Sequence, residues 1–236
     1  MASHLFIGLG GTGGKVLREL RKRIFEEFRS NEPGHDVYVD YIYVDSSDDD
    51  LNDRTGWSVL GKSVHLGEAQ KVSIHGISAS MFQNINMYPG LRAFLNAQDL
   101  CLVQEKMGPL VSAGIGGQRR RLGRTLLANN LSDKSNPRNF DAVLRSAVGR
   151  LNAASGDSNV TFHVCAGLAG GTGSGSIVDV MAQIRKLFPF QQDTKSYKMN
   201  LVLYVPEMNV VTPKHDSGFY QANGYAALQE INAISV

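Results

Sequence analysis

Short apolar runs alternate along the chain with longer segments in which apolar residues recur every three or four positions. The runs are rich in Val, Ile, Leu, Phe and Tyr, which is typical of buried strands. The longer segments gather apolar side chains on one face, which is typical of amphipathic helices. Strands are therefore predicted at residues 4–9, 37–44, 160–166 and 199–205. Helices are predicted at residues 15–29, 122–131, 139–152, 177–188 and 219–234.

This succession of strands and helices predicts the fold class. Repeated strand–loop–helix units favour a parallel sheet, because each crossover lays its helix on a face of the sheet. We expect an α/β fold with a doubly wound, mostly parallel sheet, helices on both faces, and a single domain over residues 1–236.

Residues 52–110 show the weakest patterns. A short strand is predicted at residues 63–66, and a mixed segment at 74–97 that Pro89 and Gly90 interrupt. Trp57 has no cofactor-like neighbours in the sequence, and we expect it to be a packing residue.

Three clusters of glycine stand between the predicted elements. Gly8, Gly10 and Gly13 form a GxGxxG pattern after the first strand, and residues 170–175 (GGTGSG) follow the strand at 160–166. The third cluster lies at residues 112–118. A glycine loop between a strand and a helix aims backbone N–H groups at a phosphate. A flexible Gly/Ser linker is the alternative for residues 170–175, but these residues lie directly between a strand and a helix. Crossover geometry brings all three loops to the carboxyl edge of the sheet.

Charged residues flank these loops. Asp45 ends the second strand, where an acidic residue commonly accepts a hydrogen bond from a ribose; a purely structural role is about equally favoured. For residues 48–50 (DDD) a solvated acidic turn is favoured. Arg119, Arg120, Arg121 and Arg124 open a helix, where cations oppose the helix dipole unless an anion lies nearby. Phosphate donors, a solvated basic surface and an RNA contact all remain open for these arginines.

Composition excludes some classes of protein. The chain has 236 residues, is 42% hydrophobic and carries a formal net charge of +2, too little to indicate a nucleic-acid or membrane partner. No apolar run is long enough for a membrane span, and the N-terminus does not resemble a signal peptide. Cys101 and Cys165 are far apart in sequence, which favours a reducing compartment, so a cytoplasmic location is expected. No catalytic or metal-binding set stands out, and His163, within a strand, is expected to be packed.

Several motifs together resemble the tubulin/FtsZ superfamily of GTP-binding filament proteins. Residues 169–175 (AGGTGSG) match the family motif GGGTG[ST]G at all but the first position. Residues 8–13 resemble the first FtsZ loop, with Lys15 where Asn is common. The other matching segments, in order, are Asp45 with Ser46, residues 113–117 with Gly123 and Arg124 one residue further on than in the family, residues 205–207, and residues 221–223.

The resemblance implies a nucleotide-binding domain that holds GTP or GDP, and it leaves Mg²⁺ open. Backbone N–H groups of the first two loops would hold the α- and β-phosphates, and the third loop with Arg124 would meet the γ-phosphate. Glu207 would accept from the ribose, and Asn223 would contact the base. The residues implied to bind the nucleotide are Gly10, Gly11, Thr12, Gly13, Asp45, Gly114, Gly116, Gly117, Arg124, Gly170, Gly171, Thr172, Gly173, Ser174, Glu207 and Asn223.

The resemblance also implies a partner and a reaction. The intact protein would self-associate through longitudinal contacts, and GTP would be hydrolysed by an acidic loop from the adjacent subunit. This chain is expected to lack that loop and the second, activation-type domain, as a fragment would, so GTPase activity is left open. Two alternatives remain: an NAD- or FAD-binding Rossmann protein that uses Gly8, Gly10, Gly13 and Asp45, and a non-hydrolysing, nucleotide-dependent interaction module.

Overall fold

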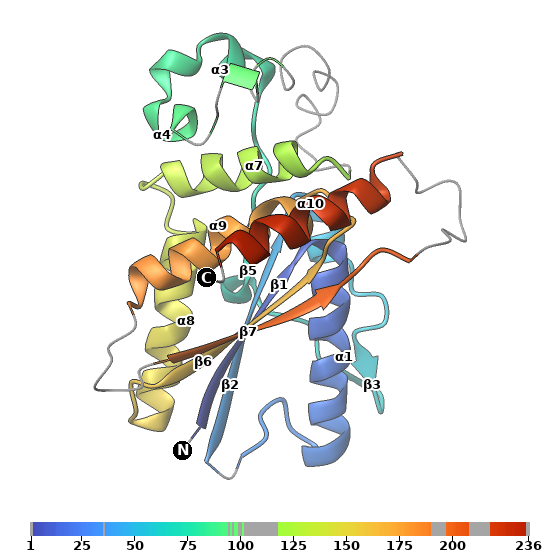
Figure 1. Ribbon diagram of the computed structural model, residues 1–236. Coiled ribbons are helices and arrows are strands. Elements are labelled where there is room, and N and C mark those ends of the chain that lie inside the picture. Colours follow the sequence, from blue (N-terminus) through green and yellow to red (C-terminus); the bar gives the residue numbers. More distant parts are fainter. Residues whose placement is uncertain are drawn as a thin grey trace.

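Five parallel strands form the central sheet of the computed structural model (Figure 1). The structure describes residues 2–34, 36–93, 95, 97–98, 101, 118–189, 197–207 and 218–234. The strands are β1 (Ala2–Leu9), β2 (Val37–Asp45), β5 (Lys71–Ser73), β6 (Val160–Gly167) and β7 (Tyr197–Tyr204), in the order β5-β2-β1-β6-β7. From β1 the chain first adds β2 and β5 on one side and then β6 and β7 on the other, so the sheet is doubly wound as predicted. The carboxyl ends of β1 and β6 lie next to each other.

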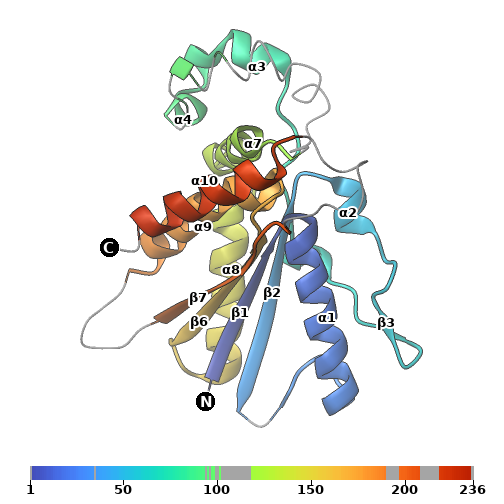
Figure 2. The ribbon, with the colours of Figure 1, turned by 45° about the vertical axis from the view of Figure 1, so that its right-hand side comes forward.

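Helices cover both faces of this sheet. Helix α1 (Gly10–Phe28) packs on one face, while α8 (Phe140–Ser155) and α9 (Thr172–Leu187) pack on the other (Figure 2). Helix α7 (Arg120–Ser132) lies against α9, and so does α10 (Tyr220–Ala233). The predicted fold class is therefore confirmed. None of the helices in the described part of the chain is long and apolar enough to cross a membrane.

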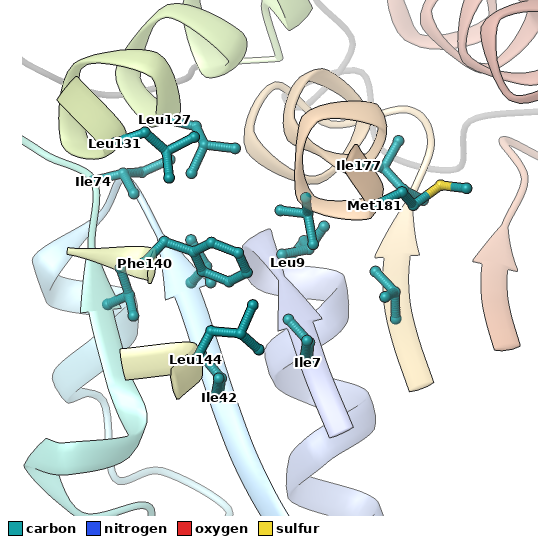
Figure 3. Packing of buried hydrophobic residues seen from close by; sticks show 14 of the residues in the cluster. Ile7, Leu9, Ile42, Ile74, Leu127, Leu131, Phe140, Leu144, Ile177 and Met181 are labelled. Carbon is teal, nitrogen blue, oxygen red and sulfur yellow. The ribbon is translucent and has the colours of Figure 1, made fainter. Parts of the chain in front are cut away.

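Alternation along the strands divides the apolar residues between two cores. Ile7 and Leu9 of β1 and Ile42 of β2 point to the same side, where they meet Phe140 and Leu144 of α8 (Figure 3). On the opposite side the smaller core is built from α1, β2 and the segment after β2, and it includes the buried Trp57, whose packing role is confirmed. Its members are Leu17, Ile24, Tyr41, Tyr43, Leu51, Trp57, Val59, Val64 and Leu66.

Two helices begin earlier than their apolar periodicity predicts. Helix α1 was expected from residue 15 and begins at Gly10, and α9 was expected from residue 177 and begins at Thr172. Residues 10–14 and 172–175 of the two glycine clusters therefore form the first turns of helices, while Gly170 and Gly171 form the bend before α9. Glycine has a low helix propensity, which hides these turns in the sequence, but close packing against neighbouring backbone holds them.

The segment after β2 differs most from expectation. The predicted acidic turn is the helix α2 (Asp48–Asn52), which Ser47 caps through Asp50 N–H, with its three aspartates exposed in the first turn. The predicted strand at 63–66 is wrong beyond Ser63, because the hairpin of β3 (Ser58–Val59) and β4 (Lys62–Ser63) ends there. The other short elements are η1 (Glu68–Gln70), α3 (Ala79–Gln83), η2 (Ile85–Met87) and α4 (Pro89–Arg92), where the proline opens a helix instead of interrupting one.

Candidate functional site

A cavity of about 510 Å³ opens where β1, β2 and β6 end. The first two glycine clusters form its walls, as the predicted convergence at the carboxyl edge requires. The lining residues are Leu9, Gly10, Gly11, Thr12, Lys15, Asp45, Ser46, Ser47, Asp50, Gln118, Gly167, Gly170, Gly171, Thr172 and Gly173. Gly114, Gly116 and Gly117 of the third cluster lie outside the described residues, and Gln118, which follows them, lines the cavity.

The first turns of α1 and α9 press against each other and against the strands below. Gly10 has φ +67°, and a Cβ there would lie 3.0 Å from the backbone nitrogen of Gly173. A Cβ on Gly13 would lie 2.6 Å from the carbonyl oxygen of Cys165. No side chain larger than hydrogen fits at these positions without moving backbone. The glycines thus bring two helix starts to one cavity.

These two helix starts also lack the usual side-chain caps. Neither Leu9 before α1 nor Gly171 before α9 accepts a hydrogen bond through a side chain, and neither helix has an acidic residue in its first turn. By contrast, Asn139 caps α8 by accepting from Ala142 N–H. The first backbone N–H groups of a helix have no intrahelical acceptor. Two positive helix ends therefore meet at the cavity, an arrangement suited to an anion such as phosphate.

Asp45 lies at the cavity wall and is held by its own neighbours. Its Oδ2 accepts from the Tyr43 hydroxyl at 2.9 Å, and its Oδ1 accepts from the backbone N–H of Ser46 at 2.7 Å and of Ser47 at 3.2 Å. Burial raises the pKa of Asp45 to about 6, although these hydrogen bonds favour its ionised form. The Ser46 hydroxyl lies 2.8 Å from the Thr172 hydroxyl, so a side-chain contact joins the end of β2 to the start of α9.

Ser174 is fully buried and hydrogen-bonds to the arginine that opens α7. Arg120 donates through Nε to the Ser174 hydroxyl (2.8 Å) and through Nη2 to its carbonyl (3.2 Å). The same guanidinium forms an ion pair with Glu230 of α10. The sequence singled out Arg120 only as one of several cations. Here it connects α7, α9 and α10 around the first turn of α9.

Asn223 is buried on the first turns of α10, where its amide links two loops. Its Nδ2 donates to the carbonyl oxygens of Gln118 and Ala169, each at 2.9 Å. It does not line the cavity, and both amide hydrogens face these two carbonyls. The structure therefore shows Asn223 positioning the loops on either side of the cavity, and contact with a base remains a prediction.

Four other predicted residues also lie outside the cavity lining: Gly13, Ser174, Arg124 and Glu207. Arg124 forms an ion pair with Asp179 of α9, with Nε 2.9 Å from Oδ2. Glu207, fully exposed, accepts a hydrogen bond from the Tyr220 hydroxyl, which lowers the pKa of Glu207. Their assigned contacts with the γ-phosphate and the ribose remain predictions. His163, expected to be packed, stacks on Phe6 with ring centroids 4.4 Å apart.

Replacing Asn223 by alanine should destabilise the fold. The carbonyls of Gln118 and Ala169 would lose the donor that they share, and an unpaired buried polar group costs about 1–3 kcal/mol. We therefore expect the free energy of unfolding in urea to fall by about 2–3 kcal/mol. Asn232→Ala, on an exposed position of the same helix, is the matched control and should change it by less than about 0.5 kcal/mol. Equal values for the two variants would show that the amide contacts contribute nothing.

Comparison with solved structures gives matches that include three CetZ proteins. CetZ from Methanosaeta thermophila strain DSM 6194 matches at 14% sequence identity and a TM-score of 0.54. The match covers 99% of this chain and 43% of the CetZ chain. The GDP-bound monomer of CetZ1 from Haloferax volcanii matches at 16% identity and a TM-score of 0.54, with 98% and 47% of the two chains covered. CetZ2 from the same organism, a GTPgS-bound protofilament, matches at 17% identity and a TM-score of 0.51. This match covers 98% of this chain and 46% of the CetZ2 chain. The likeness supports the fold, and the chain spans less than half the length of these structures.

Comparison with curated proteins gives no match. The family model described as "Tubulin like" matches residues 5–236, which is nearly the whole chain. The resemblance inferred from the glycine motifs is thereby confirmed, and the chain belongs to the tubulin-like family.

Proposed function

We propose that the domain binds a guanine nucleotide, GTP or GDP, in the cavity between the starts of α1 and α9. The observation that carries the proposal is the meeting of two uncapped helix N-termini at a cavity of about 510 Å³. Such an arrangement offers backbone donors to two phosphate groups at once. The related CetZ1 and CetZ2 structures hold GDP and GTPgS, which supports guanine as the base.

The cavity residues have distinct roles in this proposal. The backbone N–H groups of Gly11, Thr12 and Gly13 and those at the start of α9 hold the α- and β-phosphates, and Lys15 adds a positive charge at the wall. A γ-phosphate extends toward Gln118, which directly follows the third glycine cluster in the sequence. Arg124, Glu207 and Asn223 would have to turn from their present partners to reach the ligand.

Magnesium is compatible with this site as a companion of the phosphates. Asp45 and Asp50 line the cavity, and the described residues contain no group of three potential metal ligands. Mg²⁺ is commonly held by one or two carboxylates together with phosphate oxygens and water. Asp50 is the more accessible of the two carboxylates, because Asp45 is buried and accepts three hydrogen bonds from its neighbours.

For the intact protein we propose longitudinal self-association with GTP hydrolysis between subunits. The CetZ2 structure is a protofilament, and this chain covers 46% of it. In this arrangement the chain described here holds the nucleotide, and the adjacent subunit supplies the acidic group that activates water. Sedimentation of the full-length protein with GTP and with GDP tests assembly, and phosphate release at high protein concentration tests hydrolysis.

Nucleotide binding should depend on the first turn of α9. Replacing Gly171 and Thr172 together by alanine removes the hydroxyl that contacts Ser46 and adds a side chain at the helix start. We expect GTP affinity, measured by calorimetry, to fall at least about 30-fold, corresponding to about 2 kcal/mol. Gly149→Ala with Thr55→Ala is the matched control, since it makes the same two changes at exposed positions outside the cavity, and should leave affinity unchanged.

Two results would contradict the proposal. The first is unchanged GTP affinity in the α9 variant. The second is a nicotinamide or flavin cofactor, rather than GDP or GTP, released when the purified protein is denatured and analysed by liquid chromatography.

A further inference from the structure

A second cavity, of about 370 Å³, lies at the open edge of β2. Strand β5 pairs only with Tyr43–Asp45, so among the described strands residues 38–42 of β2 have a neighbour on the β1 side alone. Alternate backbone groups of these residues therefore face away from the sheet, between α1 on one face and α8 on the other. This β2-edge cavity shares no lining residue with the glycine cavity at the carboxyl ends of the strands.

Arg21 of α1 brings a buried positive charge to the β2-edge cavity. It is 8% exposed, its Nε donates to the carbonyl oxygen of Val64, and its guanidinium lies 4.8 Å from the centre of the Tyr41 ring. Within the described residues it forms no ion pair. A buried guanidinium is costly unless its five N–H groups are satisfied, and the contact with Val64 accounts for one of them.

The other charged groups among the described lining residues are one arginine and two carboxylates. Arg150 of α8 pairs with Asp40, with Nη2 2.7 Å from Oδ2, and the Gln70 amide donates to the other carboxyl oxygen at 2.7 Å. Glu32 lies in the exposed connection between α1 and β2 and lines the cavity. Tyr41 is 1% exposed, and its hydroxyl has no hydrogen-bond partner within the described residues. Arg21 therefore has no ion-pair partner in the described part of the chain, and the Asp40 carboxylate, which acts on its charge, is already paired with Arg150.

We propose that the β2-edge cavity binds a small molecule through a carboxylate or phosphate group that accepts hydrogen bonds from the Arg21 guanidinium. The planar fork of arginine matches both groups, since each offers two oxygens to parallel N–H donors. The cavity is near the lower end of the range for small-molecule sites, about 300–1,000 Å³. Backbone groups along the open edge of β2 supply further donors and acceptors for the rest of the ligand.

Titration with simple anions, followed by amide NMR, tests this site directly. Inorganic phosphate and succinate are added separately at constant ionic strength. We expect saturable shifts of the Arg21 Nε–H signal and of the Val39, Asp40 and Tyr41 amides, with a dissociation constant of about 1–10 mM. The anion with the lower dissociation constant identifies the class of ligand, phosphate or carboxylate. Phosphate bound in the glycine cavity would shift the signals of Gly11 and Gly171 instead, so the two proposals fail separately.

Three variants decide the role of Arg21. Arg21→Met should weaken binding at least 10-fold, whereas Arg23→Met removes a charge from an exposed position of the same helix, 83% exposed at its side chain, and should bind as the wild type does. Arg21→Lys retains the charge without the fork and should bind at least about 5-fold more weakly; it carries the test if Arg21→Met does not fold. Saturable shifts by neither anion, or wild-type affinity in either Arg21 variant, would overturn the proposal.

Discussion

Replacing Gly175 by alanine should lower the free energy of unfolding by about 3 kcal/mol, at the upper end of the range for overpacked sites. A Cβ at this position would overlap the carbonyl oxygen of Arg120 and lie 2.9 Å from the backbone nitrogen of Arg124. Both obstacles are backbone atoms of α7, so no side-chain rotation relieves the clash. Helix α7 would have to move away from α9 as a unit.

The position is sensitive because α7 and α9 approach each other closely at glycines, Gly123 on α7 and Gly175 on α9. A Cβ on Gly123 of α7 would overlap the carbonyl oxygen of Gly171, just as one on Gly175 would overlap α7. Moving α7 would also stretch the hydrogen bonds from Arg120 to Ser174 in the first turn of α9. We therefore expect Gly175→Ala to weaken nucleotide binding as well as the fold.

Gly149→Ala is the matched control for this prediction. Gly149 is exposed in the interior of α8, and a Cβ there would meet no atom within 4 Å. Alanine has the higher helix propensity, so the free energy of unfolding should rise by about 0.5–1 kcal/mol. Urea denaturation measures both variants. Opposite signs are expected, and a Gly175→Ala protein as stable as the Gly149→Ala protein would show that α7 and α9 are not in close contact.

The sequence could predict the sheet and its helices because their periodicities are local. The strands at 37–44 and 160–166 were correct to within one residue, and α7 to within two. The starts of α1 and α9 could not be found in this way. Their glycines have low helix propensity, and packing against distant backbone such as Cys165 carbonyl holds them helical.

The sequence predicted which backbone segments meet at the candidate site, but it did not predict the contacts of several side chains there. Glycine clusters after strands identify a phosphate loop by chain order alone, and the structure brings two of them together. Side-chain partners depend on which elements meet in space. The contacts of Asn223 with Gln118 and Ala169 span more than 50 residues of sequence, and those of Arg120 with Ser174 and Glu230 do too. No local pattern separates such positioning residues from residues that touch the ligand.

The free energy of unfolding should also depend strongly on pH, because Asp45 is buried. Its pKa in the folded protein is about 6, above the usual 3.8 of an aspartate, because burial disfavours the ionised form. Below about pH 4 the group is protonated in both the folded and the unfolded state. Between about pH 4 and 6 the unfolded state loses its proton first, so the stability that this group contributes at low pH is lost as the pH rises. At about 1.4 kcal/mol per pH unit the loss reaches about 3 kcal/mol by pH 7.

Asp45→Asn should remove this dependence. Asparagine retains an acceptor for Ser46 and Ser47 N–H and can donate to the Tyr43 hydroxyl oxygen, so the local contacts persist. Relative to the wild type, the variant should gain about 3 kcal/mol between pH 4 and pH 7, measured by urea denaturation at each pH. Other titrating groups are common to both proteins and cancel in the difference.

Tyr43→Phe tests the cause of the Asp45 pKa, because the tyrosine hydroxyl donates to the ionised carboxylate and lowers its pKa. Removing that hydroxyl while keeping the ring should raise the pKa of Asp45 further, and the pH range of the stability loss should extend upward. The titration of the Asp45 carboxyl carbon, followed by NMR, gives the pKa directly. A value below 4, or a stability difference between the wild type and Asp45→Asn that is constant from pH 4 to 7, would show that the carboxylate is well solvated. Its place at the wall of the glycine cavity would then leave it free to accept from a ligand, as the sequence first suggested.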